Sequence, residues 1–421
     1  MALLHKLLLA VIPLLAILFA LVQPQLKLAG VLPARTPHPA KNIGQCEVVE
    51  GLEACEDAWV HTERGLVYLA CSSLRSRAHW QPACAEFNAS GVLSFSVPPD
   101  SLRLFDFSTR RQREVKLVGL PPASRGQVFT HGLDVLSSTN EETGEEELTI
   151  FLISHRPPFH NPDAAPSAGA DSVIEVFRTT LGASTATWLR TVSNPLVRTP
   201  NNLVATRLAS SSSRLGFWVT NDHKTKGAGW GKKLEMLRPE KSEIVWCEFE
   251  QREGGAVQCR YAAEGIVYPN GIAKGPENLL YSASTLEGTV TVWEIQSDRM
   301  LVPVDVIPLN RPIDNLHVSP STGSILAVTF PKAAQFGATS PSPANPDKPR
   351  KGGAAVEVWK VANETGEAQF YGQKYKTEVA LADPEGKVVS AITSAVPYTD
   401  ELLLTGYFTP HAVVCKMPQE L

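Results

Sequence analysis

The chain has 421 residues, of which 43% are hydrophobic, and a formal net charge of −4. This length and apolar content suit a large closed β-architecture with a sizeable core. Lysine and arginine are scattered along the chain, so no basic patch indicates nucleic-acid binding. The 32 prolines and 29 glycines indicate many turns between short strands rather than long helices.

Residues 1–30 are predicted to be a signal-anchor or a signal peptide. One lysine precedes an apolar run from Leu7 to Val22. The run is long for the apolar region of a signal peptide and slightly short for a membrane span, which needs about 20 residues. No clean small-residue cleavage site follows, so a retained anchor is favoured over a cleaved peptide. Either one directs the chain into the secretory pathway, with the rest of the protein membrane-anchored on the lumenal or extracellular side, or secreted.

Residues 31–45 form a proline-containing tether, and residues 46–421 are predicted to be one domain. Short runs with alternating apolar residues recur in it, among them "GLVYLACSS", "LTIFLISH" and "GSILAVTF". A polar loop and a second strand-like run, such as "TVTVWEI" or "AAVEVWKV", follow most of them. About six such units, on the order of 60 residues apart, favour an all-β, six-bladed β-propeller over a sandwich. Two inserts, at 138–148 and 336–354, are predicted to be surface loops.

Seven cysteines fit the oxidising compartment that the leader implies. Cys247 and Cys259 flank a Gly-Gly segment and are expected to be neighbours in a hairpin. Cys71 and Cys84 are a weaker candidate pair, which leaves Cys55 without a partner.

Further features of the sequence suit a secretory domain. Cys46 and Cys415 lie near the two ends of the predicted domain, where a bond between them would tie the chain ends together. Asn88 and Asn363 begin N-glycosylation motifs and are candidate glycan acceptors.

Four short segments place oxygen-bearing side chains beside apolar strands, although Asn and Asp are disfavoured in strands. They are "EACEDAWV" with Glu56 and Asp57, "TPNNLVAT" with Asn201 and Asn202, "VYPNGIAKG" with Asn270, and "RPIDNLHV" with Asp314 and Asn315. Each segment alone has the composition of a turn, the Asn-Gly pair above all. Their recurrence favours another interpretation, because the radial symmetry of a propeller would bring such positions together at one mouth of the central channel.

A metal site is one hypothesis for this set. The side chains concerned are those of Glu56, Asn201, Asn270, Asp314 and Asn315. They offer oxygen ligands only, which suit a hard cation of high coordination number, and calcium best. Such an ion can polarise a carbonyl or phosphoryl oxygen and hold the oxyanion that forms.

Two histidines are candidates for acid–base chemistry. His131 in "QVFTHGLDV" and His155 in "IFLISHRPP" lie at strand edges in consecutive segments. Each alone is typical of a structural histidine, but near a Lewis-acidic metal one can deprotonate water while the other tunes it. The sequence contains no G-x-S-x-G elbow and no H-E-x-x-H motif, so the usual signals of a serine hydrolase and of a zinc protease are missing.

The chain resembles the serum paraoxonase/arylesterase family, whose members are six-bladed calcium propellers that hydrolyse lactones and esters. The resemblance lies in a series of short motifs that occur in the same order and at similar intervals as in the family. The motifs are "CEVVEGLEACED", "THGLDV", "LISH", "NNLVA", "VTNDH", "YPNGI", "IDNLHVSPSTG" and "HAVVC". The resemblance covers nearly the whole chain after the leader. It also implies that the hydrophobic leader is kept and that Cys46 and Cys415 form the disulfide that closes the ring.

The resemblance implies roles for the candidate residues. A catalytic calcium ion would be held by Glu56, Asn201, Asn270, Asp314 and Asn315. A second, structural calcium would be held by Asp57 and the backbone carbonyl of Leu133. His131 would be the general base on water, with His155 as its partner. Asn202 stands where the family has a second acidic ligand for the structural calcium, so that ion is expected to bind more weakly.

Three functions fit these residues. The first is calcium-dependent hydrolysis of lactones and aryl esters, extending to phosphotriesters. The second is a gluconolactonase-like or strictosidine-synthase-like reaction on the same fold, and the third is a non-catalytic, calcium-stabilised binding propeller. The expected partners are a small lactone or ester and, through the apolar N-terminal segment, a membrane or lipid surface, with no nucleic acid.

Overall fold

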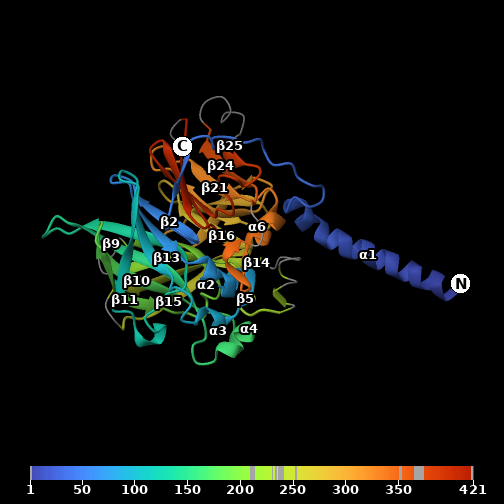
Figure 1. Cartoon of the computed structure of the whole chain (residues 1–421), viewed down its shortest axis with the longest axis horizontal. Helices are drawn as coiled ribbons and strands as arrows, with labels where there is room; N and C mark the ends of the chain where they lie inside the picture. Colours follow the sequence, from blue (N-terminus) through green and yellow to red (C-terminus); the bar gives the residue numbers. More distant parts are fainter. Residues whose placement is uncertain are drawn as a thin grey trace.

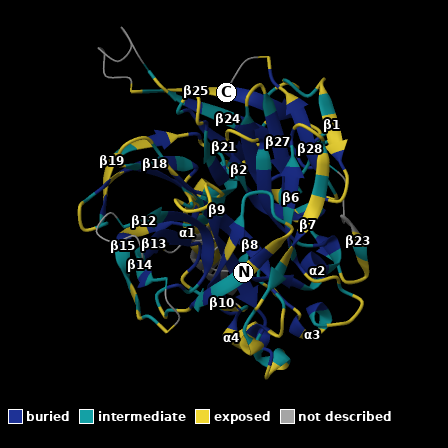
Figure 2. Ribbon diagram, turned by 90° about the vertical axis from the view of Figure 1, so that its left-hand side faces the viewer, coloured by how far each residue is buried: buried dark blue, intermediate teal, exposed yellow. Residues whose placement is uncertain are grey.

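The structure is a computed structural model that describes residues 2–208, 214–229, 231, 232, 235, 241–251, 254–349, 353–364, 374–418 and 421. Within these residues, six four-stranded antiparallel blades form a ring (Figure 2). Six inner strands contact one another around it: β2 (Cys55–His61), β8 (Thr130–Thr139), β12 (Pro200–Arg207), β16 (Pro269–Lys274), β20 (Ile313–Val318) and β26 (Ser394–Tyr398). The predicted six-bladed propeller is therefore confirmed.

Five blades run outward from their inner strands in chain order. The β2 blade continues with β3 (Leu66–Cys71), β6 (Ser101–Asp106) and β7 (Arg111–Val118), and the β8 blade with β9 (Glu146–Arg156), β10 (Asp171–Thr180) and β11 (Thr185–Val192). The β12 blade continues with β13 (Arg214–Asn221), β14 (Lys241–Glu250) and β15 (Val257–Val267), and the β16 blade with β17 (Leu279–Ser284), β18 (Thr289–Ile295) and β19 (Leu301–Pro308). The β20 blade continues with β21 (Ile325–Thr329), β24 (Val356–Asn363) and β25 (Tyr375–Asp383). A short parallel pairing of β7 with β11 joins two neighbouring blades at the rim.

Both ends of the domain build the sixth blade. Its strand order is β26, β27 (Glu401–Thr405), β28 (Ala412–Lys416) and then β1 (Cys46–Val49) from the other end of the domain. Cys46 lies opposite Cys415 in the β1–β28 pairing, and the two form a disulfide. The bond therefore closes the ring, as the resemblance implied.

Replacing both Cys46 and Cys415 with serine is expected to lower the free energy of unfolding by about 3–5 kcal/mol, because the bond closes a loop with a sequence separation of 369 residues. Urea unfolding followed by tryptophan fluorescence measures this loss. The matched control removes the Cys247–Cys259 bond, which closes a separation of only 12 residues, and it should cost less. An equal or larger loss in the control would contradict a ring held closed by the first bond.

The core lies between neighbouring blades, where the apolar faces of their strands meet. Between the β8 and β12 blades, for example, Phe217 packs against Phe151 and Phe249, with ring centroids 5.9 and 6.4 Å away. Strands that are buried on both faces need nearly continuous apolar residues. This explains why the segments "IFLIS" and "FWV" contain almost no polar residues. This packing holds the inner strands, and thus the channel, in fixed positions.

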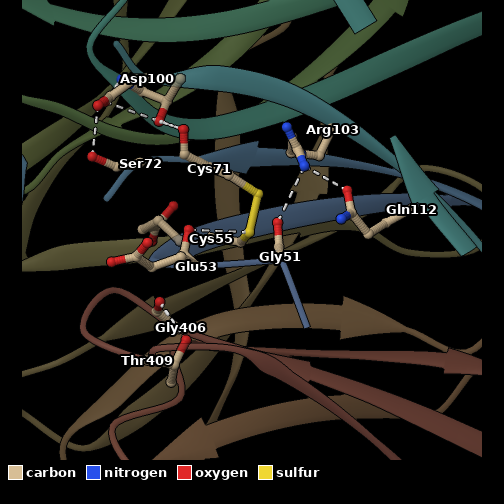
Figure 3. Close-up of a disulfide and its surroundings, with 12 residues drawn as sticks. Gly51, Glu53, Cys55, Cys71, Ser72, Asp100, Arg103, Gln112, Gly406 and Thr409 are labelled. Carbon is tan, nitrogen blue, oxygen red and sulfur yellow. Dashed lines mark hydrogen bonds between the residues drawn. A yellow bond between two sulfur atoms is a disulfide. The ribbon is translucent and has the colours of Figure 1, made fainter. Parts of the chain in front are cut away.

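One predicted cysteine pair is wrong. Cys55 bonds to Cys71, and Cys84 is free (Figure 3). Cys55 and Cys71 face each other directly in the antiparallel pairing of β2 with β3, whereas Cys84 lies beyond α2 (Leu74–His79), on the short helix η1 (Pro82–Cys84). The Cys247–Cys259 pair is confirmed as a cross-strand bond between β14 and β15.

Short elements cover one end of the ring. They are α2, β4 (Trp80–Gln81), η1, β5 (Glu86–Phe87), α3 (Ala89–Val92), η2 (Pro122–Ser124), η3 (Pro162–Ala164), α4 (Ala165–Ala168), α6 (Ala333–Thr339), β22 (Pro341–Ser342) and β23 (Asn345–Pro349). The insert at 336–354, predicted to be a surface loop, instead forms part of α6 and the β22–β23 hairpin. It bonds back to the α2 region, since Gln81 Nε2 donates to Ser340 Oγ over 3.2 Å.

Helix α1 (Ala2–Leu28) projects away from the ring (Figure 1). Its segment Val11–Leu28 is long and apolar enough to cross a membrane. The chain after it lies against the β20 blade, where the backbones of Lys41 and Ala382 pair and the His38 N–H donates to Glu357. The tether thus fixes where the helix leaves the ring.

Candidate active site and metal centre

Five inner strands interrupt their pairing at the predicted site residues. The register shifts fall between Cys55 and Asp57, Thr130 and Leu133, Pro200 and Leu203, Pro269 and Ile272, and Ile313 and Leu316. A β-bulge adds a residue to one strand and re-aims side chains. The residues within these bulges that face one common pocket are Glu56, His131, Asn201, Asn270 and Asp314.

The Asn-Gly pair in "YPNGI" is not a hairpin turn. Gly271 lies where two inner strands approach closely, and a methyl group there would come within 2.6 Å of both the Asn315 Cα and the Asp314 carbonyl oxygen. Only glycine permits this approach. The bulge at Asn270 and the bulge at Asp314 are thereby held against each other, which brings their side chains to the same pocket.

Four buried oxygen atoms in this pocket lack a hydrogen-bond partner among the described residues: Glu56 Oε2, Asn201 Oδ1, Asn270 Oδ1 and Tyr407 Oη. The first three are carboxylate or amide oxygens. An unsatisfied buried polar atom costs about 1–3 kcal/mol. Asn315 is fixed beside them, because its Nδ2 donates to Glu56 Oε1 over 2.8 Å. Unpartnered oxygens from three separate blades are the donor set that a calcium ion requires, so these residues fit the ion that the resemblance implies.

The charge in the pocket agrees with a cation. Burial raises the pKa of Glu56 well above its usual value, and the negative charges of Asp57 and Asp314 raise it further. Burial also raises the pKa of Asp314, to about 8. Two buried carboxylates close together are costly when ionised, and a divalent cation would offset their charge. In the described part of the chain, no group of three or more His, Cys, Asp or Glu side chains is arranged to hold a metal ion by itself, and most of the candidate donors here are asparagine amides.

The two histidines lie side by side next to this oxygen set. The ring of His131 is 4.9 Å from that of His155, edge to face, and its Nε2 lies 4.0 Å from Glu56 Oε1. Burial lowers the pKa of His131 well below its usual value, with the positive charges of His155 and Arg77 adding to the effect. Burial lowers the pKa of His155 to about 4. Both imidazoles are therefore neutral at neutral pH, the form that can accept a proton.

Hydrogen bonds fix the start of β8, which carries His131. The buried carboxylate of Asp100 accepts from Ser72 Oγ over 2.6 Å (Figure 3) and from the Thr130 N–H over 2.8 Å. Thr130 Oγ1 in turn donates to the Cys71 carbonyl over 3.1 Å. The Cys55–Cys71 disulfide and this network hold β2 and β8 together beside the pocket. The side chain of His155 is oriented separately, since its Nδ1 lies 2.9 Å from Ser172 Oγ.

Sequence reasoning missed the walls of the pocket. The guanidinium of Arg77 stacks 3.9 Å from the ring centroid of Tyr407, which lies 5.4 Å from the ring of His131. Phe336 from α6 and Cys84 from η1 complete one side of the pocket, whose volume is about 50 Å³. These residues come from α2, η1, α6 and the β27–β28 loop, which connect the second and third strands of their blades, and no periodic pattern marks them in the sequence.

The other predicted ligands lie farther along the same strands. Asp57, Leu133 and Asn202 line a separate cavity of about 440 Å³. The structure therefore divides the predicted ligands into two groups. The oxygens of Asp57 are hydrogen-bonded, as its Oδ2 accepts from the Leu133 N–H over 3.2 Å.

Asp222 and His223, which also match the family motif, lie next to each other and are buried. His223 Nδ1 is 2.8 Å from Asp222 Oδ1. Asp222 lines a narrow space together with His155 and Lys232. Neither residue lines the pocket of Glu56: Asp222 lies beside His155, and the ring of His223 lies 4.5 Å from that of Tyr268.

Fold and site together define a class: propeller hydrolases of the esterase or lactonase type, with oxygen donors and a neutral histidine pair at one end of the channel. The sequence model of the arylesterase family matches residues 165–417, which is more than half of the chain. The protein belongs to the arylesterase family.

Its relatives are distant but match along most of their length. The chain is 23% identical over 397 residues to serum paraoxonase/arylesterase 2 of Canis lupus familiaris, covering 93% of this chain and 94% of the relative. It is 22% identical over 377 residues to human serum paraoxonase/arylesterase 1, covering 89% of each.

Solved structures similar to this one include a gluconolactonase from Xanthomonas campestris, with a TM-score of 0.44, 12% identity and 92% coverage of each chain. Another is the calcium-binding protein regucalcin from Agrobacterium tumefaciens, with a TM-score of 0.41 and 10% identity. The match covers 91% of this chain and 95% of the regucalcin chain. Both likenesses are too distant to bear on the site.

Proposed function

We propose that this protein is a calcium-dependent hydrolase of lactones and aryl esters. The observation that supports this most directly is the group of three buried, unpartnered oxygens of Glu56, Asn201 and Asn270 in one pocket with the neutral imidazole of His131. These desolvated oxygens come from separate blades and have no hydrogen-bond partner among the described residues, and they supply the ligand type that calcium takes.

In this proposal the ion is held by the side chains of Glu56, Asn201, Asn270, Asp314 and Asn315. When bound, calcium supplies a positive charge that polarises a carbonyl oxygen and stabilises negative charge on it. His131 takes a proton from the attacking water, which its buried, unprotonated ring allows. His155, held by Ser172, keeps the His131 ring in position and tunes its basicity.

The pocket walls favour an uncharged, compact substrate. Tyr268, Phe336 and Tyr407 give it aromatic sides, and Ala83 adds an apolar surface. A lactone or an aryl ester presents a carbonyl together with an apolar ring, which suits such walls. Phosphotriesters are also uncharged and carry a phosphoryl oxygen, so they are expected as secondary substrates.

Removing calcium is expected to lower hydrolysis of a γ-lactone and of phenyl acetate by at least about 100-fold, because the developing oxyanion loses its main stabilising charge. The measurement is a rate assay on the full chain before and after treatment with a chelator, followed by addition of calcium or, as the matched control, magnesium. Calcium should restore the rate and magnesium should not.

Full activity after chelation would rule this mechanism out. Bound calcium that raises thermal stability without turnover of any ester, lactone or phosphotriester would instead indicate the binding propeller. Turnover restricted to sugar lactones and unchanged in a His131→Gln variant would favour the gluconolactonase-like alternative.

The membrane is the second proposed partner, through a retained N-terminal anchor. The Ala333 N–H at the start of α6 donates to the Ala29 carbonyl, just past the end of α1, over 3.2 Å. The same helix α6 supplies Phe336 to the pocket wall. A membrane-inserted α1 would therefore hold the domain with α6 close to the lipid surface, on the lumenal or extracellular side. Asn88 and Asn363, the proposed glycan acceptors, are both exposed.

Alkaline carbonate extraction tests the anchor. The full chain is expected to stay with the membrane fraction, and a chain that lacks residues 1–30 behind a cleavable signal should be recovered in the medium with its activity intact. Release of the full chain by carbonate, or a mature N-terminus beyond Val22, would contradict a retained anchor.

A further inference from the structure

We infer that the second, structural ion implied by the family resemblance is replaced in this chain by a side chain, His317, so that the protein holds one calcium ion and not two. This inference rests on the proposed function for the first ion only. It concerns the group Asp57, Leu133 and Asn202, which lies apart from the pocket of Glu56.

The carboxylate of Asp57 is already engaged by protein donors. Its Oδ2 accepts from the Leu133 N–H over 3.2 Å, and its Oδ1 accepts from Ser394 Oγ over 3.3 Å. His317 Nε2 lies 3.5 Å from the same Oδ1 and 2.6 Å from Ser394 Oγ. Asp57 is 2% exposed, so a carboxylate this deeply buried needs such partners. Both oxygens of Asp57 therefore have a protein donor, and the His317 imidazole lies next to one of them.

The second expected ligand is also committed elsewhere. Asn202 Nδ2 donates to Asn315 Oδ1 over 2.8 Å, and Asn202 Oδ1 accepts from the Leu203 N–H over 2.7 Å. The amide thus links two inner strands, β12 and β20, by a hydrogen bond. An aspartate at this position would lack the donor that this bond requires, so asparagine here suits a hydrogen-bonded network rather than a charged metal ligand.

The pocket of Glu56 and the group around Asp57 differ in whether their buried oxygens have hydrogen-bond partners. Glu56, Asn201 and Asn270 each keep a buried oxygen without a partner, whereas no oxygen of Asp57 or Asn202 is among the unsatisfied buried atoms of the described residues. Three of the oxygens proposed for the first ion are thus free to bind it, although Asn315 Oδ1 accepts from Asn202, whereas both oxygens of Asp57 already have protein donors. His317 comes from β20, three residues beyond the Asp314 bulge, so one strand serves both places.

The test is the number of calcium ions bound per chain, measured by elemental analysis and isothermal titration on the full protein after chelation and reloading. The wild type should bind one ion, which Glu56→Gln abolishes. A double variant, Asn202→Asp with His317→Ser, restores a second acidic ligand and removes the imidazole. It is expected to bind two ions if His317 takes the place of the second one.

Each result decides between the claims. Two ions in the wild type, one of which is lost in Asp57→Asn, would overturn the inference. A double variant that has the circular dichroism spectrum of the wild type and still binds one ion would overturn the role given to His317. A wild type that binds no ion would contradict the proposed function. It would still agree with the inference that Asp57 holds no ion. A wild type with one ion and a double variant with two would establish the replacement.

Discussion

A His131→Gln variant is expected to hydrolyse a lactone with kcat about 10²- to 10⁴-fold below that of the wild type, the range that a general base contributes. Glutamine keeps the size and polarity of the side chain but cannot accept the proton of the attacking water. The ring of His131 lies 4.9 Å from His155 and 5.4 Å from Tyr407, so its packing is largely retained by glutamine. Steady-state kinetics with the calcium-loaded variant measures the loss.

Two controls make this result specific. His160 is exposed on the surface, and His160→Gln should leave kcat unchanged. Calcium affinity of His131→Gln should match that of the wild type, because no role as ligand is proposed for His131. Wild-type turnover by the folded, calcium-loaded variant would show that another group is the base.

A Glu56→Gln variant should reverse the order of stability between calcium-free and calcium-loaded protein. Without calcium, Glu56 is a buried carboxyl group close to Asp57 and Asp314. Removing it is expected to leave stability unchanged or raise it by about 1–3 kcal/mol. With calcium, the wild type gains stability by mass action, and the variant gains little because its affinity falls by at least about 100-fold.

Thermal unfolding with chelator and with excess calcium, on both proteins, shows whether the two melting temperatures change places. Glu50 is exposed, so Glu50→Gln serves as the matched control and should follow the wild type in both conditions. Glu56→Gln protein that is less stable than the wild type even with chelator would mean that Glu56 stabilises the fold itself and does not serve an ion.

The architecture could be predicted because its causes are local. Alternating apolar residues define each strand, and their repetition along the chain defines the blades. The oxygen-bearing side chains of the pocket could also be predicted, since residues such as Asn270 and Asp314 interrupt otherwise apolar strands. Their side chains are then aimed by β-bulges at the start of the inner strands.

Other features depend on tertiary structure and left no pattern in the sequence. The partner of Cys55 is set by the register of β2 against β3, which shifts at Glu56. Tyr407 and Phe336 reach the pocket from segments without periodic sequence, and Arg77 stacks on Tyr407 from behind the pocket wall. His317 continues β20 as an ordinary strand residue, and only the fold places its ring beside Asp57.

The most direct test is a crystal structure of the calcium-loaded protein with anomalous diffraction to locate the ion. We expect a single strong peak at one end of the channel, about 2.3–2.6 Å from oxygens of Glu56, Asn201, Asn270, Asp314 and Asn315. Calcium-saturated crystals with no peak there, or with these side chains turned away from the ion, would contradict the account.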